Sequence, residues 1–346
     1  AFRLPGWLRG GGDIAHDASL YFLIYALSVP FLQLGILSSN MLKSAGNMQI
    51  PSIMSVLMCV LDVCFNYLFI YVAGLGVPGA ALGTVLSIAI VASVEAWFAL
   101  FRSSILALRL DEERFVWLWS YVRNAVKISA PIAAQYVLMS GAQIVSTYIV
   151  APLGNFAIAA NTFAITAESL CYMPGYGIGD AATTLVGQSM GAGQYGLCRR
   201  FAKLTVGMGM AVMALMGVVM YVFAPEMIGL MTPVEEIRDL GTQVLRIEAF
   251  AEPMFAAAIV GNCVCVGAGD TLKPSLMNLA SMWGVRLTLA AVLAHWYGLQ
   301  GVWTAMAIEL TFRGTLFLVR LKWGAWLRTE GGVEKNNAGG GRQALL

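Results

Sequence analysis

Hydrophobic positions along the chain gather in nine long segments that are separated by shorter polar connectors. A helix that crosses the hydrocarbon core of a bilayer needs about 20 mostly apolar residues. The pattern therefore predicts nine transmembrane helices, at residues 19–42, 51–73, 79–101, 128–151, 156–190, 201–223, 240–267, 274–297 and 301–321. Pro174 and Pro253 lie inside the fifth and seventh segments, where we expect them to bend the helix.

The composition agrees with an all-α membrane protein and excludes several other classes. Of the 346 residues, 59% are hydrophobic and 12% are charged, whereas soluble domains carry about 25% charged residues. This balance excludes an ordinary cytosolic enzyme, a disordered protein and a secreted disulfide scaffold. The formal net charge of +2 implies no nucleic-acid partner. Two histidines and six scattered cysteines predict no metal, redox or disulfide site.

Basic residues alternate between the two sides of the predicted segments. Lys and Arg occur after the first, third, fifth, seventh and ninth segments. The connectors at 74–78 and 152–155 are uncharged, and the connector at 224–239 is mostly acidic. By the positive-inside rule, we expect the long connector at 102–127 and the C-terminus to be cytoplasmic. The glycine-rich tail at 329–346 is predicted to be disordered.

The chain also contains an internal repeat. When Pro30 is aligned with Pro253, other residues that shape the backbone coincide as well. Ala45-Gly46 falls on Ala268-Gly269, Pro51 on Pro274, and, after one deletion, Gly76 and Gly79 on Gly298 and Gly301. Segments one to three thus correspond to segments seven to nine in the same orientation. A parallel repeat of this kind is typical of transporters with two lobes, and we place the lobes at 1–101 and 128–328.

The two predicted lobes are unequal, because the second has six segments and the first has three. We expect about 110 further residues, enough for three more spans, to precede Ala1. The alternative is a duplication of three segments only.

Five stretches resemble a known family. Residues 186–193 read VGQSMGAG, and residues 173–181 just before them read MPGYGIGDA. The others are Ser129-Ala130-Pro131, Ala268-Gly269-Asp270 with Pro274, and Gly301-Val302-Trp303 downstream of Arg286. In this order, over a parallel repeat, they resemble the multidrug and toxic compound extrusion (MATE) antiporters across almost all of residues 13–328.

The resemblance implies twelve helices in two six-helix lobes, so that this chain holds helices four to twelve and lacks the first three. It implies a multi-pass secondary transporter of the plasma (bacterial inner) membrane, not an enzyme, that works as a monomer among membrane lipids. Its substrates would be small organic compounds, often cationic or amphipathic, exported against inward Na+ or H+. No cofactor is implied beyond that coupling ion.

In the first lobe, Asp62 and Asn66 form the strongest candidate for a cation site. They lie four residues apart in the middle of a segment and therefore share one helix face. A carboxylate with a carboxamide oxygen at membrane depth could hold Na+ or a proton. The resemblance adds Thr84 as a matching hydroxyl, with Ser39 and Asn40 as the nearest polar residues on the preceding helix. The family has Asn before Asp at this site, whereas this chain has the reverse order. The alternative is a structural hydrogen bond at Asp62.

In the second lobe, two acids and several other residues are candidates for a substrate cavity. Glu168 and Glu252 lie near the middle of their segments, where an acid is costly and usually functional. The alternative for both is hydrogen bonding between helices. Many family members carry an acid near the position of Met139, so the acid role would have moved to Glu168 or Glu252. Other candidates for the cavity are Gln135, Tyr136, Met139 and Gln143.

Arg286, Glu309 and Arg313 are predicted to form a structural ion pair. Arg286 and Glu309 lie on neighbouring segments, and Glu309 and Arg313 are one helical turn apart.

Two other functions are kept as alternatives. A lipid or lipid-linked-sugar flippase of the same superfamily would need a basic cavity, and buried cations in this chain are few. An intramembrane aspartyl protease is a remote alternative, because Gly177-Ile178-Gly179-Asp180 matches its G-x-G-D string and Asp62 could supply a second acid.

Overall fold

The computed structural model describes residues 12–103, 106, 119–324 and 326–327. Within these ranges the chain is built from helices and short turns, without strands. It divides into two compact units, Ala1–Val116 and Trp117–Leu346. The boundary falls in the predicted connector at 102–127. Most of this connector, together with the predicted disordered tail at 329–346, lies outside the described residues.

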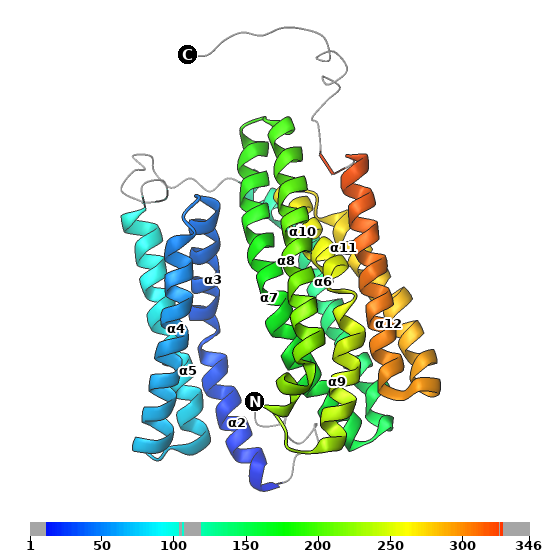
Figure 1. Ribbon diagram of the computed structural model, residues 1–346. Coiled ribbons are helices and arrows are strands. Elements are labelled where there is room, and N and C mark those ends of the chain that lie inside the picture. Colours follow the sequence, from blue (N-terminus) through cyan, green and yellow to red (C-terminus); the bar gives the residue numbers. More distant parts are fainter. Residues whose placement is uncertain (1–11, 104–105, 107–118, 325, 328–346) are drawn as a thin grey trace. The chain divides into compact units, whose positions relative to one another are not determined.

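The N-terminal unit is centred on α5 (Gly76–Trp97), against which α2 (Gly12–Leu27), α3 (Val29–Ser44) and α4 (Gln49–Tyr67) all pack. Figure 1 draws these helices in blue to cyan. Short π-helical stretches, η1 (Leu68–Val72) and η2 (Phe98–Arg102), extend α4 and α5. The packed face of α5 is rich in small residues, which let helices approach closely. At Gly83, for example, an added Cβ would come within 2.9 Å of the backbone nitrogen of Asn66 on α4.

The C-terminal unit contains the remaining helices. They are α6 (Trp119–Val150), η4 (Ala151–Leu153), α7 (Asn155–Gly191), α8 (Tyr195–Gly229), α9 (Glu235–Ala249), α10 (Glu252–Gly267), α11 (Leu272–Ala280), η5 (Ser281–Arg286) and α12 (Leu287–Trp323). Figure 1 shows α7 and α8 as a long pair in green, and α10 packs against α7, α8 and α12. Gly314 of α12 lies so close to α10 that an added Cβ would come within 3.1 Å of the Met254 Cα.

All nine predicted segments coincide with helices, but fewer of these helices meet the length and apolarity of a membrane span. Five do so by themselves, and seven if each of two bent pairs is taken as one span. One of the five, Leu272–Trp323, contains both the eighth and the ninth predicted segments. Its helix is interrupted at Gly298, whose backbone is not helical (φ 58°, ψ −136°). Helix α7, over the fifth segment, carries Asn161 and Glu168 in its apolar stretch and is not among the seven. It continues through Pro174 as one helix.

The internal repeat is visible in the backbone. The direction changes by 43° between α2 and α3 and by 59° between α9 and α10. Pro30 and Pro253 each occupy the second position after the break, where a proline costs no helical hydrogen bond. The bend predicted at Pro253 is thereby confirmed.

The helices that follow these breaks end in the same way. Gly46 and Gly269 adopt left-handed φ values of 85° and 77°, which favour glycine. Each donates its N–H to a carbonyl three residues earlier, at 2.9 Å in both copies. Gly76 and Gly298, at the next pair of aligned turns, both have φ of 58°. The two copies therefore share their hinges and turns.

Candidate functional site

Three buried glutamates meet in the C-terminal unit. Glu168 comes from α7, Glu248 from α9 and Glu252 from α10, and their exposed fractions are 4%, 0% and 0%. They lie close enough to interact electrostatically with one another, and Arg286 interacts with Glu168 and Glu248. All four carboxylate oxygens of Glu248 and Glu252 are buried without a hydrogen-bond donor among the described residues. We call Glu168, Glu248 and Glu252 the glutamate cluster.

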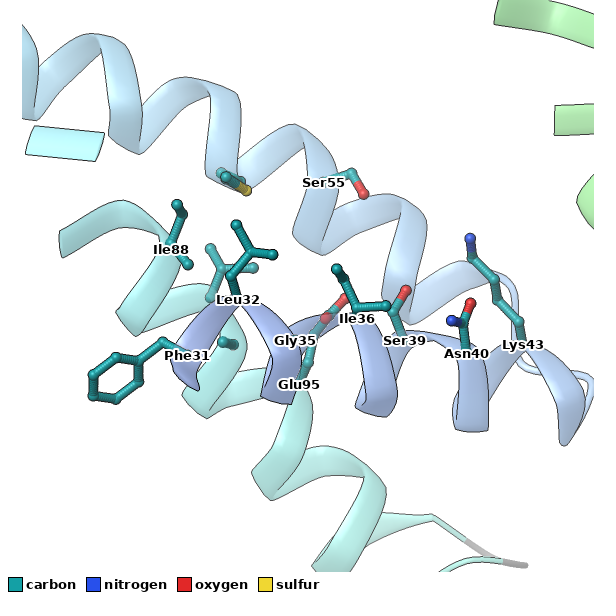
Figure 2. A pocket seen from close by; sticks show the side chains of 13 residues that line it. Phe31, Leu32, Gly35, Ile36, Ser39, Asn40, Lys43, Ser55, Ile88 and Glu95 are labelled. Carbon is teal, nitrogen blue, oxygen red and sulfur yellow. The ribbon is translucent and has the colours of Figure 1, made fainter. Parts of the chain in front are cut away.

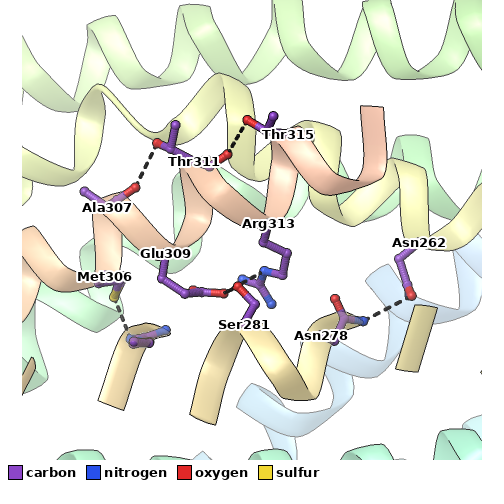
Figure 3. Close-up of polar contacts among 10 residues, drawn as sticks. Asn262, Asn278, Ser281, Met306, Ala307, Glu309, Thr311, Arg313 and Thr315 are labelled. Carbon is purple, nitrogen blue, oxygen red and sulfur yellow. Dashed lines mark hydrogen bonds and ion pairs between the residues drawn. The ribbon is translucent and has the colours of Figure 1, made fainter. Parts of the chain in front are cut away.

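A second polar group adjoins the glutamate cluster (Figure 3). One oxygen of its acid, Oε1 of Glu309, is paired, whereas Oε2 is buried without a hydrogen-bond partner among the described residues. Glu309 of α12 is fully buried and accepts a hydrogen bond from the Ser281 hydroxyl at 2.6 Å. The Glu309 carboxylate also pairs with the Arg313 guanidinium, at 3.2 Å between Oε1 and Nε. Arg286 interacts electrostatically with Glu309, and its Nη2 lies 2.6 Å from the Met306 sulfur. Arg286, Glu309 and Arg313 therefore occupy one neighbourhood, with the direct ion pair between Glu309 and Arg313.

A small cavity of about 180 Å³ lies on the other side of Arg313. Its walls come from α6, α7, α10, α11 and α12, all within this unit. The Arg313 guanidinium stacks over the Phe255 ring, 5.8 Å from its centroid. The polar lining is completed by an amide pair, in which Asn278 donates to Asn262 at 3.2 Å (Figure 3). Three predicted cavity residues, Gln135, Tyr136 and Met139, line it as well.

In the N-terminal unit, Asp62 and Asn66 lie one turn apart on α4, as their spacing predicts. Each has its Oδ1 atom buried without a hydrogen-bond partner among the described residues. Asn66 packs on Gly83 of α5. Thr84 is the next residue in the chain after Gly83. Asn66 therefore lies at the contact between α4 and α5, with Asp62 one turn earlier on the same face of α4.

A cavity of about 460 Å³ opens between α3, α4 and α5, farther along the same two helices (Figure 2). Ser55 of α4 lines it, and its spacing from Asp62 places both on one helix face. Buried Glu95 contributes the acid of the cavity and interacts electrostatically with Lys43, which also lines it. Ser39 and Asn40 belong to this cavity and not to the group around Asp62. By helical rise, Glu95 is about 16 Å along α5 from Thr84.

The structure thus divides the predicted residues into separate groups. Gln143 is exposed on α6 and does not line the cavity that contains Gln135. Within the described residues, no three His, Cys, Asp or Glu side chains are arranged to hold a metal ion.

Sequence reasoning did not select Glu248, Glu95 or Ser281 as site residues. Glu248 lies one turn before Glu252 across the Pro253 break, and this spacing was the available signal. The partners of Glu95 and Ser281 come from other helices, and local spacing does not reveal them.

Comparisons with known proteins agree on one family. The family model described as MatE matches residues 131–292. A probable multidrug resistance protein NorM of Thermotoga maritima is 27% identical, over 91% of this chain and 68% of that protein. An uncharacterized transporter YisQ of Bacillus subtilis is 24% identical, over 93% of this chain and 72% of that protein. The chain therefore spans about seventy per cent of the length of these relatives.

Solved structures have the same fold. The MATE transporter VcmN of Vibrio cholerae superposes with a TM-score of 0.83 at 18% identity, over 92% of this chain and 72% of that one. A multidrug resistance MATE family transporter in an outward-facing conformation superposes with a TM-score of 0.86 at 20% identity, over 95% of this chain and 73% of that one. At these identities the likeness shows the fold alone.

Proposed function

This chain belongs to the multidrug and toxic compound extrusion (MATE) family of membrane secondary transporters, and we propose that it exports small organic compounds in exchange for an inward-moving cation. The cation is Na+ or H+. The protein then works in the plasma membrane with its C-terminus in the cytoplasm, as the distribution of basic residues predicts.

The observation that carries this proposal is the burial of Glu248 and Glu252 with four unpaired carboxylate oxygens. Carboxylates at membrane depth are costly, and those that persist mark ion pathways. A buried carboxylate without hydrogen-bond donors is unfavourable, and binding of a proton or Na+ neutralises its charge. The glutamate cluster therefore suits an ion that is taken up and released in each transport cycle.

In this proposal, ion binding at the glutamate cluster is coupled to substrate binding through the Glu309–Arg313 ion pair. Arg313 lines the small cavity with Gln135, Tyr136 and Met139, and Glu309 adjoins Arg286, which interacts with the glutamate cluster. Loading an ion on the glutamate cluster changes the field on Arg286, and this alters how strongly Glu309 holds Arg313. The cavity and the acids are thus linked by the Glu309–Arg313 ion pair and by the electrostatic interaction of Arg286 with Glu309 and the glutamate cluster.

The group around Asp62 is the second ion site in our proposal. Its unpaired Asp62 and Asn66 oxygens are acceptors that suit a proton or Na+. Thr84, which follows Gly83 in the chain, is the hydroxyl candidate for this site. The larger cavity with Glu95 and Lys43 lies along the same face of α4 and provides space beside this site.

Transport by proteoliposomes tests the glutamate cluster. In the full-length protein we expect uptake of the cationic dye ethidium under an imposed Na+ or pH gradient, and its loss in Glu248→Gln and Glu252→Gln. The matched control is Glu235→Gln, the same chemical change at an exposed position on α9. Dye transport by both buried variants at the control rate would overturn the assignment.

Asp62→Asn tests the other site in cells that lack their own efflux pumps. We expect loss of dye export at normal protein level in the membrane, whereas Asp239→Asn, an exposed change on α9, keeps it. Normal export by Asp62→Asn would refute the role of Asp62. A flippase would instead translocate a fluorescent phospholipid and leave ethidium unmoved.

A further inference from the structure

A basic cavity of about 610 Å³ lies between α8 and α12 in the C-terminal unit, away from the groups described above. It is bounded by the first turns of α8 and the last turns of α12, so it opens at one end of both helices. Among the residues that the structure describes, three cationic side chains line it and no acidic side chain does. The cations are Arg199, Lys203 and Lys322.

The described part of the chain places no counter-charge on these cations. Within the residues that the structure describes, none of the three forms an ion pair, and all three are exposed. Arg320, two residues before Lys322, provides the contrast because it is paired with Asp270. The cavity therefore presents uncompensated positive charge to a ligand.

The rest of the cavity is apolar and continues along the helices. Its inner wall is formed by Val206, Gly207, Met210 and Leu318. Two tryptophans complete its rim. Trp326 is buried and donates its indole N–H to the Leu321 carbonyl at 3.2 Å, whereas Trp323 is 80% exposed. Tryptophan at the end of a spanning helix is typical of the interface between lipid headgroups and hydrocarbon.

We propose that this cavity binds an anionic phospholipid of the surrounding leaflet. The phosphodiester lies among Arg199, Lys203 and Lys322, and an acyl chain follows the apolar wall past Gly207. The basic-residue pattern predicts that this end of α8 and α12 is cytoplasmic. In that leaflet, basic pockets between spanning helices bind anionic headgroups. A soluble anion would use the cations but not the apolar wall.

Native mass spectrometry of the purified chain tests the proposal with two probes, dioleoylphosphatidylglycerol and dioleoylphosphatidylcholine. We expect retention of the anionic lipid in preference to the zwitterionic one. Lys203→Gln weakens its binding about five-fold, because one cation near a lipid surface contributes about that factor. The control is Arg200→Gln, which removes one exposed charge on the same helix from a residue outside the cavity. Equal retention of both lipids, or equal loss in the two variants, overturns the proposal.

Gly207→Leu tests the acyl chain separately from the headgroup. A Cβ at Gly207 meets no atom within 4 Å, so a side chain can start there unobstructed and extend into the cavity that Gly207 lines. Gly196→Leu is the control, because Gly196 is also unobstructed but does not line the cavity. We expect Gly207→Leu, and not Gly196→Leu, to reduce binding of phosphatidylglycerol. Unchanged lipid binding in Gly207→Leu, or complete displacement of the lipid by inorganic phosphate, would instead indicate a site for a soluble anion.

Discussion

Glu309 and Glu252 are both fully buried acids, yet replacement by leucine is expected to change stability in opposite directions. Glu309 holds Ser281 and Arg313, whereas both oxygens of Glu252 lack a hydrogen-bond donor. Arg286 also interacts electrostatically with Glu309. The same substitution therefore removes an acid with one paired oxygen, Oε1, in one case and an acid with no paired oxygen in the other.

The magnitudes follow from these contacts. Glu309→Leu leaves Arg313, whose side chain is 11% exposed, without its counter-charge. Breaking a buried pair in this way costs about 3–5 kcal/mol of unfolding free energy. Glu252→Leu removes two buried acceptors whose lack of partners costs about 1–3 kcal/mol, so it should stabilise the protein by about that amount. The two variants should then differ by about 4–8 kcal/mol.

The assay is equilibrium unfolding in mixed micelles, in which sodium dodecyl sulfate is titrated and helix content is followed by circular dichroism. Dye transport is measured on the same preparations. We expect Glu252→Leu to be more stable than the parent protein and inactive in transport, because active sites often give up stability for function. Destabilisation of Glu252→Leu to the level of Glu309→Leu would mean that Glu252 is held by contacts that our reasoning omits.

Two further outcomes are expected. Gly314→Ala should destabilise the protein by about 1–3 kcal/mol, because its new Cβ meets the backbone at Met254; Gly177→Ala on α7, which meets no atom, should stabilise it by up to about 1 kcal/mol. Both values come from thermal unfolding, and equal shifts would contradict the packing argument. In a cysteine-free background, a membrane-impermeant maleimide should label Asn155→Cys in intact cells and Gln194→Cys only after lysis; the reverse order would invert the predicted orientation.

The positions of the helices and the repeat could be predicted because both depend on local chemistry. Long apolar runs define helices, and Pro253 and Gly269 impose their backbone geometry wherever they occur. Whether each segment forms a separate membrane span was less predictable, because this depends on more than the length of the segment. Helix α7 carries polar residues that lower its apolarity, and the chain remains helical on both sides of the break at Gly298.

The candidate site was predictable only in part. Asp62 and Asn66 share a face because they are four residues apart on one helix. Gln135 and Gln143 are eight residues apart, about 12 Å along α6 by helical rise, and only Gln135 reaches the cavity. The partners of Glu309 come from η5 and α12, and those of Glu248 from four other elements. Which residues of different helices come together depends on the packing between those helices. The spacing of residues along a single sequence does not reveal it.

The break between α9 and α10 has a mechanical consequence. Glu248 and Glu252 stand on opposite sides of this 59° joint. Any force between the two acids, or its relief when an ion neutralises one of them, acts directly on the angle of the joint. Helix α10 contains 16 residues and is about 24 Å long, so a rotation of about 10° would carry its far end through about 4 Å. A change of less than 1 Å at the acids would thus produce a movement at the far end of α10 that is large enough to open or close a passage.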